Sequence, residues 1–229
     1  MRYTTLGVLA LAVALAACAE PGTGPTSQTV GTNEGGRPSS PALLAGGASP
    51  VIVAAAPIGP FPGSGSGISG EAILTRSTAG LWVDQDIDGL TPGYAYSVWW
   101  VIFDNPQGCV ASTCAPSDLA RPQAQGSLVN GGGFVAAGTT QSYSSHLARH
   151  DVDGAHVPMG DPSGVDNTYR AQVHVALRSH GVAEANPADQ AVQTSQFNGF
   201  CHLPPDPPGV CQNVSVAVFS APDAPGQGS

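Results

Sequence analysis

The pattern of apolar and polar positions predicts β-strands along most of the chain after residue 67. No long window has helical periodicity, whereas turn residues recur about every ten to fifteen positions. The clearest strand covers residues 94–103, YAYSVWWVIF, where both alternating sets of side chains are apolar. Such a strand is expected to be central in its sheet and covered on both faces. Other alternating stretches lie at residues 81–88, 169–178 and 213–219, with shorter candidates at 71–75 and 133–137.

These short strands predict a mainly β fold, an antiparallel β-sandwich, within residues 68–221. About 150 residues are enough for one domain with a sizeable core. Residues 18–67 are rich in Gly, Pro, Ser, Thr and Ala and predict a disordered, flexible tether. Within it, the apolar stretch 51–56 is either a short first strand or a segment packed on the domain. Residues 222–229 predict a disordered tail.

The stretch LTPGYAYSV at residues 90–98 resembles the Leu-x-Pro-Gly-x-x-Tyr-x-Val segment of fibronectin type III domains. In that family the tyrosine hydroxyl bonds to backbone upstream, which forms a tyrosine corner. The resemblance covers nine residues and implies that Tyr96 closes a sandwich corner here. The longer stretch 89–109 is similar to secreted bacterial β proteins, and this similarity implies no activity.

The first 17 residues have the pattern of a secretory signal peptide. Arg2 precedes an apolar run that is too short to span a bilayer, which takes about 20 residues. The run ends in Leu15-Ala16-Ala17-Cys18, which resembles the lipobox of bacterial lipoproteins. This resemblance implies cleavage before Cys18, a diacylglyceryl group on its thiol and an acylated amino terminus, with chains such as palmitate. Two or more chains anchor a protein firmly in a membrane.

The implied location is therefore the bacterial cell envelope, with the membrane as a partner through the lipid anchor. Because Ala19 follows the cysteine, the same resemblance implies the outer membrane in a Gram-negative cell. The alternative is an ordinary cleaved signal that happens to be followed by a cysteine.

Four further cysteines, Cys109, Cys114, Cys201 and Cys211, remain beside the lipid site. An even number in an exported protein predicts two disulfides. Of the three possible pairings, the two local ones are favoured, because each closes a short loop and would contribute roughly 2–3 kcal/mol. A four-cysteine metal site would need shorter spacings.

The charge balance excludes several classes of partner. All seven basic residues are arginines, and cleavage before Cys18 leaves six of them against 16 acidic residues, a net charge of −10. Such a chain is a poor ligand for nucleic acid. The absence of lysine excludes a Walker A nucleotide loop, a Ser-x-x-Lys nucleophile and Schiff-base chemistry. No catalytic set is marked by spacing, so a binding or structural role is expected, with a protein or glycan partner left open.

Three histidines are candidate ligands for zinc or copper. His146, His150 and His156 have the offsets of the metzincin motif H-E-x-x-H-x-x-G-x-x-H. Leu147 replaces the general-base glutamate and Asp153 replaces the glycine, so protease activity is not expected. The imidazoles alone could still hold a metal ion. The alternative is a polar loop at residues 142–166, rich in Asp and Gly.

Two other histidines are not expected to bind metal. His174 shares its strand face with Arg170 and Arg178, whose charges oppose a bound cation, and is predicted to be a surface residue. The sequence Ser-His-Gly at 179–181 is predicted to form a turn.

Two further patterns have a structural and a functional interpretation. Residues 84–89, DQDIDG, match the opening of a calcium loop, but Ala95 occupies the position of its bidentate glutamate, so an acidic outward strand face is favoured. A set of aromatic residues either forms a sugar-stacking platform or, as is favoured, lies in the core. These residues are Trp82, Tyr94, Tyr96, Trp99 and Trp100.

Overall fold

The computed structural model of the chain describes residues 50–150, 159–160, 164–201 and 211–222. Within them the chain forms nine strands, two short 3-10 helices and one α-helix. In order these are β1 (Ile52–Pro60), β2 (Ser69–Arg76), β3 (Gly80–Asp88), β4 (Tyr94–Phe103), η1 (Pro106–Gly108), η2 (Pro116–Ala120), β5 (Gly126–Val135), β6 (Thr140–Ala148), β7 (Met159–Gly160), β8 (Gln172–Val182), α1 (Pro187–Ser195) and β9 (Gln212–Phe219). No helix among the described residues is long and apolar enough to cross a membrane.

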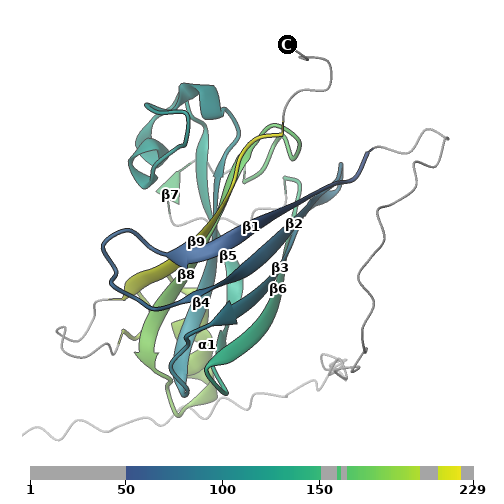
Figure 1. Ribbon diagram of the computed structural model, residues 1–229. Helices are drawn as coiled ribbons and strands as arrows, with labels where there is room; N and C mark the ends of the chain where they lie inside the picture. Colours follow the sequence, from purple (N-terminus) through teal and green to yellow (C-terminus); the bar gives the residue numbers. More distant parts are fainter. Residues whose placement is uncertain (1–49, 151–158, 161–163, 202–210, 223–229) are drawn as a thin grey trace, which may run out of the picture. The chain divides into compact units, whose positions relative to one another are not determined.

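The predicted antiparallel β-sandwich is confirmed. The strands form a continuous antiparallel sheet in the order β6-β3-β2-β1-β9-β8-β4-β5-β7 (Figure 1). Strand β1 joins two halves, because Ile52–Ile58 pair with β2 whereas Gly59 and Pro60 pair with β9. The apolar inner sides of both halves share one large core cluster. Burial of that apolar area is the main force that holds the halves together.

Strand β4 is buried on both faces, as its sequence predicts. Val98, Trp100 and Ile102 belong to the main core between the two halves of the sheet. Trp99 and Phe103 point to the other side and form a second apolar cluster. This second cluster includes residues of the loop 104–125 and, after α1, Phe197, so these two segments cover the outer side of β4.

Side chains bridge β5 and β6, so that the sheet is nearly closed. The Tyr143 hydroxyl and the Ser145 hydroxyl both donate to the Gly131 carbonyl, at 2.9 and 2.8 Å, and Trp100 Nε1 donates to Ser145 Oγ at 3.0 Å. A Cβ on Gly131 would lie 2.8 Å from both Ser145 Oγ and Trp100 Nε1. Glycine is therefore required at residue 131 for the two strands to approach this closely.

The predicted boundary between tether and domain at residues 67 and 68 is wrong. Strand β1 lies inside the segment 18–67 and has partners on both sides, and its Ile58 is 4 % exposed. The stretch 51–56 is thus part of the first strand, one of the two alternatives. Backbone pairing along both edges outweighs the low strand propensity of Pro57, Gly59 and Pro60. The predicted signal peptide, residues 1–17, most of the tether and nearly all of the predicted tail lie outside the described residues.

Both local disulfides are confirmed. Cys109 pairs with Cys114 and Cys201 pairs with Cys211, with Cα–Cα distances of 5.3 and 5.0 Å.

Tyr96 makes the hydrogen bond that the stretch 90–98 predicts. The Thr91 N–H donates to the Tyr96 hydroxyl at 3.0 Å. This is the bond of a tyrosine corner.

Candidate functional site

The structure gives the candidate metal-binding histidines separate surroundings. His146 is exposed on the outward face of β6 and stacks on Trp82, with ring centroids 4.3 Å apart. His150 lies after β6, with its Nδ1 2.9 Å from Asp166 Oδ1. His156 lies outside the described residues, so the three-histidine site for zinc or copper stays a prediction.

The core interpretation of the aromatic residues is confirmed. Tyr96, Trp99 and Trp100 are at most 2 % exposed, so they present no ring face to a sugar. Trp82 alone of the three tryptophans is partly exposed, and its neighbour there is His146. The alternative, a sugar-stacking platform made by all five aromatic residues, is therefore excluded.

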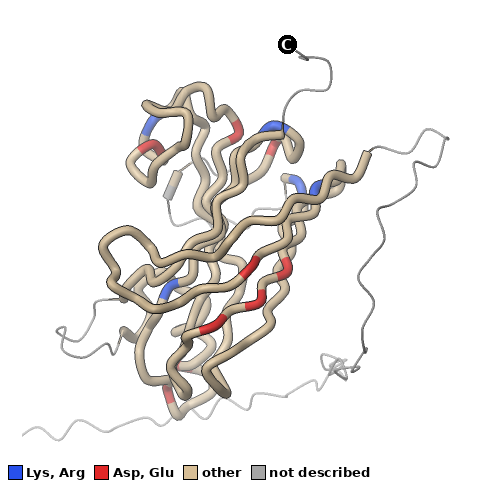
Figure 2. The backbone as a smooth tube through the Cα atoms, viewed as in Figure 1, with Lys and Arg blue, Asp and Glu red and all other residues tan. Residues whose placement is uncertain are grey.

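The acidic residues of β3 form an outward strand face, as favoured over a calcium loop. Asp84, Asp86 and Asp88 are exposed on one side of the strand, and Glu71 of β2 lies opposite Asp86. Figure 2 shows acidic positions gathered on this part of the sheet. The hydroxyls of two β6 serines donate to Asp84 and Asp86, at 2.5 and 2.6 Å.

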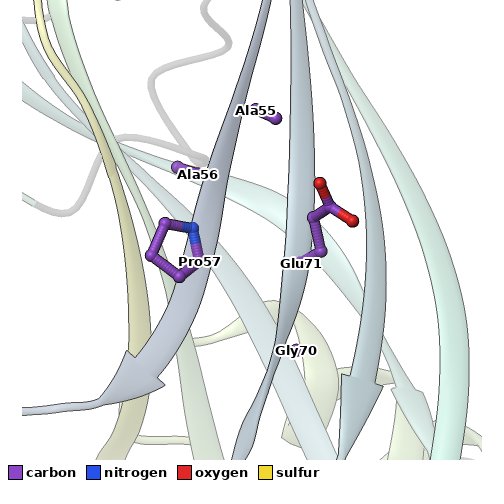
Figure 3. A pocket seen from close by; sticks show the side chains of 5 residues that line it. All are labelled: Ala55, Ala56, Pro57, Gly70 and Glu71. Carbon is purple, nitrogen blue, oxygen red and sulfur yellow. The ribbon is translucent and has the colours of Figure 1, made fainter.

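A small pocket of about 390 Å³ lies over β1 and β2 (Figure 3). Its lining is Ala55, Ala56, Pro57, Gly70 and Glu71. Among the described residues that line it, Glu71 has the one ionisable side chain, and the other four offer only small apolar groups. The pocket therefore has too few polar groups to orient a ligand.

A larger groove of about 780 Å³ lies where β4 and β9 end and β8 begins. These strand ends meet because β4 and β9 both run antiparallel to β8, which places Phe103 opposite Gln172 and Phe219 opposite Val173. Carboxamide side chains dominate the lining. They belong to Asn105, Gln107, Gln125, Asn167 and Gln172.

Asp104 fixes one wall of the groove. Its carboxylate accepts hydrogen bonds from the backbone N–H groups of Asp166 and Asn167, at 3.1 and 2.9 Å. Arg149 donates to the Asp166 carbonyl at 2.7 Å and holds the same segment from outside. Arg170 is exposed at the rim, so the groove carries charge of both signs.

Gln125 lies in the left-handed backbone region, with φ 49°. A non-glycine residue adopts this conformation rarely and at some cost in free energy. It precedes β5 and lines the groove, where its carbonyl accepts from the Asp104 N–H at 3.3 Å. The turn therefore holds the loop 104–125 against the end of β4.

His174 is buried next to Gln172, which lines this groove, so its prediction as a surface residue is wrong. It is 6 % exposed, and burial lowers its pKa to about 4, which leaves the imidazole neutral near pH 7. Gln172 Nε2 donates to His174 Nε2 at 2.6 Å, and Phe103 contacts the ring edge-on. The reason for the difference is the loop 104–125, which covers the outer side of β8 as well as β4.

The predicted turn at residues 179–181 is also wrong, because β8 continues to Val182 and His180 is fully buried. Trp99 Nε1 donates to Ser97 Oγ at 2.8 Å, and Ser97 Oγ donates to His180 Nε2 at 2.7 Å. His180 Nδ1 then donates to the Gly199 carbonyl at 2.8 Å. In this arrangement both ring nitrogens of a neutral His180 are hydrogen-bonded, Nε2 as the acceptor and Nδ1 as the donor.

The pKa of His180 is lowered to about 4, chiefly by burial, while the bond to Gly199 raises it and the positive charge of Arg178 lowers it. Cys211 Sγ of the second disulfide lies 3.1 Å from His180 Nδ1. Ser97 and His180 are both 0 % exposed, so the hydrogen bond between them is shielded from solvent. A sequence signal was available here, since Ser97 is a polar residue among apolar outward positions of β4 and needs a buried partner.

Arg178 attaches the segment after α1 to the sheet. Its guanidinium donates to the Phe197 carbonyl at 2.6 Å and to the side chains of Asn198 and Asn213 at 2.8 Å. The guanidinium carbon also lies 3.9 Å from the centre of the Phe197 ring. These bonds hold the segment that carries Gly199 and Cys201 over His180.

No protein-family model, curated protein or solved structure matches this chain.

Proposed function

We propose that the chain is an exported lipoprotein of the bacterial cell envelope whose sandwich domain binds a small polar ligand. The groove between the ends of β4, β8 and β9 carries this proposal, because it gathers five carboxamides around two carboxylates and an arginine. In this proposal the domain binds a ligand, and lipid chains on Cys18 anchor the protein in the membrane.

The disulfides support export. Two of them brace the described part of the chain, and disulfides persist in oxidising compartments. With four cysteines paired, Cys18 is the remaining cysteine, and it lies where the lipobox resemblance places the acylated residue.

The chemistry of the groove favours a saccharide as ligand. A carboxamide offers both a donor and an acceptor, as does each sugar hydroxyl, so the two groups pair in either sense. None of the described residues that line the groove is aromatic. Affinity would therefore come from hydrogen bonds to the carboxamides, with Arg170 and the carboxylates at the edges.

Substitution of the rim residues tests this ligand class. Gln107→Ala and Arg170→Ala remove exposed side chains from the groove, and each is expected to weaken binding of a saccharide about tenfold, since one hydrogen bond contributes roughly 1 kcal/mol and more when charged. The measurement is ligand-observed NMR with a panel of mono- and disaccharides. Thr140→Ala, on exposed β6, is the matched control and should bind as the wild type does. The proposal would be wrong if no saccharide bound, or if both Gln107→Ala and Arg170→Ala bound it as well as the wild type does.

The lipid anchor is tested by metabolic labelling with an alkyne fatty acid in a bacterial host. The wild-type chain should carry the label, and Cys18→Ser should lose it completely, because the thiol and the new amino terminus are both lost as acylation sites. The double variant Cys109→Ser, Cys114→Ser removes two thiols elsewhere and should keep the label. Label on Cys18→Ser, or none on the wild type, would contradict a lipid anchor at this residue.

A further inference from the structure

We propose that His180, Cys201 and Cys211 form a redox-gated zinc site, which is closed while the disulfide is formed and binds one zinc ion when it is reduced. This site is separate from the groove and does not depend on the proposed function. Within the described residues, these three side chains make up a group whose ligand atoms all lie within 4.8 Å of one another.

The three side chains and the Gly199 carbonyl can surround tetrahedral zinc once the two sulfurs separate and the sulfur and carbonyl oxygen each move away from His180 Nδ1 by about 0.5 Å. Ligand atoms around such an ion lie about 3.3–3.8 Å apart, because Zn–N is about 2.0 Å and Zn–S about 2.3 Å. Cys211 Sγ is 3.1 Å from His180 Nδ1 and 3.9 Å from the Gly199 carbonyl oxygen. That oxygen is 2.8 Å from Nδ1 and is placed to supply the fourth ligand.

Burial and charge also favour this ion. All three residues are at most 5 % exposed, as in structural zinc sites, whose ligands are closed off from water. Two thiolates balance the charge of Zn²⁺, so the loaded site is neutral and can remain buried. His180 Nε2 faces Ser97 Oγ, a hydrogen-bond partner on the ring nitrogen that does not bind the metal. Such a partner orients the imidazole.

The redox step balances with a dithiol as reductant. The dithiol gives two electrons and two protons to the Cys201–Cys211 bond, which breaks to two thiols, while the reductant forms its own disulfide. Zinc then displaces both thiol protons to solvent as two Zn–S bonds form. The Nδ1 proton of His180 is replaced by zinc, and Nε2 takes up a proton and donates it to Ser97 Oγ.

The other disulfide supplies an internal control. Cys109 and Cys114 are paired at nearly the same Cα–Cα distance, but the polar neighbour of Cys114 Sγ is the Pro106 carbonyl, at 3.7 Å. The two cysteine pairs therefore differ in whether an imidazole lies beside the sulfurs. After reduction both pairs are thiols, so a difference in zinc binding between them reports on the imidazole.

The test uses the wild-type protein without a histidine tag, reduced by a phosphine and given zinc chloride. One equivalent of zinc should bind, with release of two protons. Zinc should protect Cys201 and Cys211 from alkylation at least tenfold, mapped by mass spectrometry, and should leave Cys109 and Cys114 reactive. X-ray absorption should show two sulfurs and one imidazole nitrogen on zinc. The oxidised protein should bind less than a tenth of an equivalent.

Variants separate the role of the imidazole from that of the thiols. His180→Gln should weaken zinc binding at least tenfold, while the double variant Cys109→Ser, Cys114→Ser should bind as the wild type does. The proposal would be overturned by protection of all four cysteines or of none. It would equally be overturned by sulfur-only ligation in the wild type, a result that needs no substitution and is independent of how well a variant folds.

Discussion

The free energy of unfolding is expected to fall by several kcal/mol as the pH is lowered from 7 to 4. His174 and His180 are buried in the folded domain, where desolvation lowers each pKa from 6.5 to about 4. In the unfolded chain both histidines take up protons below pH 6.5. The unfolded state therefore binds more protons between pH 6.5 and 4, and stability that is fully present above pH 7 is lost across that window.

Each histidine is expected to account for a loss on the order of 3 kcal/mol, since one pKa unit corresponds to about 1.4 kcal/mol. The measurement is denaturant unfolding at a series of pH values between 7 and 4. His174→Gln and His180→Gln should each remove about half of the histidine part of the pH slope, compared with each variant's own stability at pH 7. Unchanged slopes in both buried variants would contradict the neutral, buried state of these side chains.

The second large effect is expected at Trp100, where substitution by alanine should destabilise the fold by about 4 kcal/mol. Removal of a fully buried tryptophan costs about 3–5 kcal/mol through lost apolar burial and the cavity that remains. Trp100 is 0 % exposed in the main core, and its Nε1 donates to Ser145 in the bridge between β5 and β6. The substitution therefore also weakens the near-closure of the sheet.

Trp82→Ala is the matched control for this prediction. Trp82 has the same side chain, but it lies partly exposed on the outward face of β3 with His146. Its loss should cost about 1 kcal/mol or less, as for substitutions away from the core. Thermal and denaturant unfolding measure both variants. Equal losses for the two tryptophans would contradict the placement of Trp100 in the core.

Local pattern was sufficient to predict β4, several other strands and the disulfides, but it missed β6, part of which lies where a polar loop was the alternative, and α1. Strand β4 is recognisable because both of its faces are apolar, and residues 109–114 and 201–211 close short loops. The predicted start of the domain, residue 68, is too late along the chain because Pro57, Gly59 and Pro60 of β1 resemble the Gly/Pro-rich segment around them. Their strand conformation depends on pairing with β2 and β9, which a local pattern does not contain.

The groove and the His180 site could not be predicted from local sequence pattern, for a different reason. The groove combines residues from the ends of three strands with two loops, so its lining is set by topology. His180 lies in a Ser-His-Gly sequence that is typical of a turn, yet segments distant in sequence cover it. Only Ser97, a lone polar residue on an apolar strand face, pointed from the sequence to a buried polar partner.

The mass of the amino-terminal peptide of the mature protein tests the central claim of a lipid-anchored envelope domain most directly. Cleavage between Ala17 and Cys18, with a diacylglyceryl group on the thiol of residue 18, is the predicted result. An unmodified Cys18, or a mature chain that begins at another residue, would contradict it.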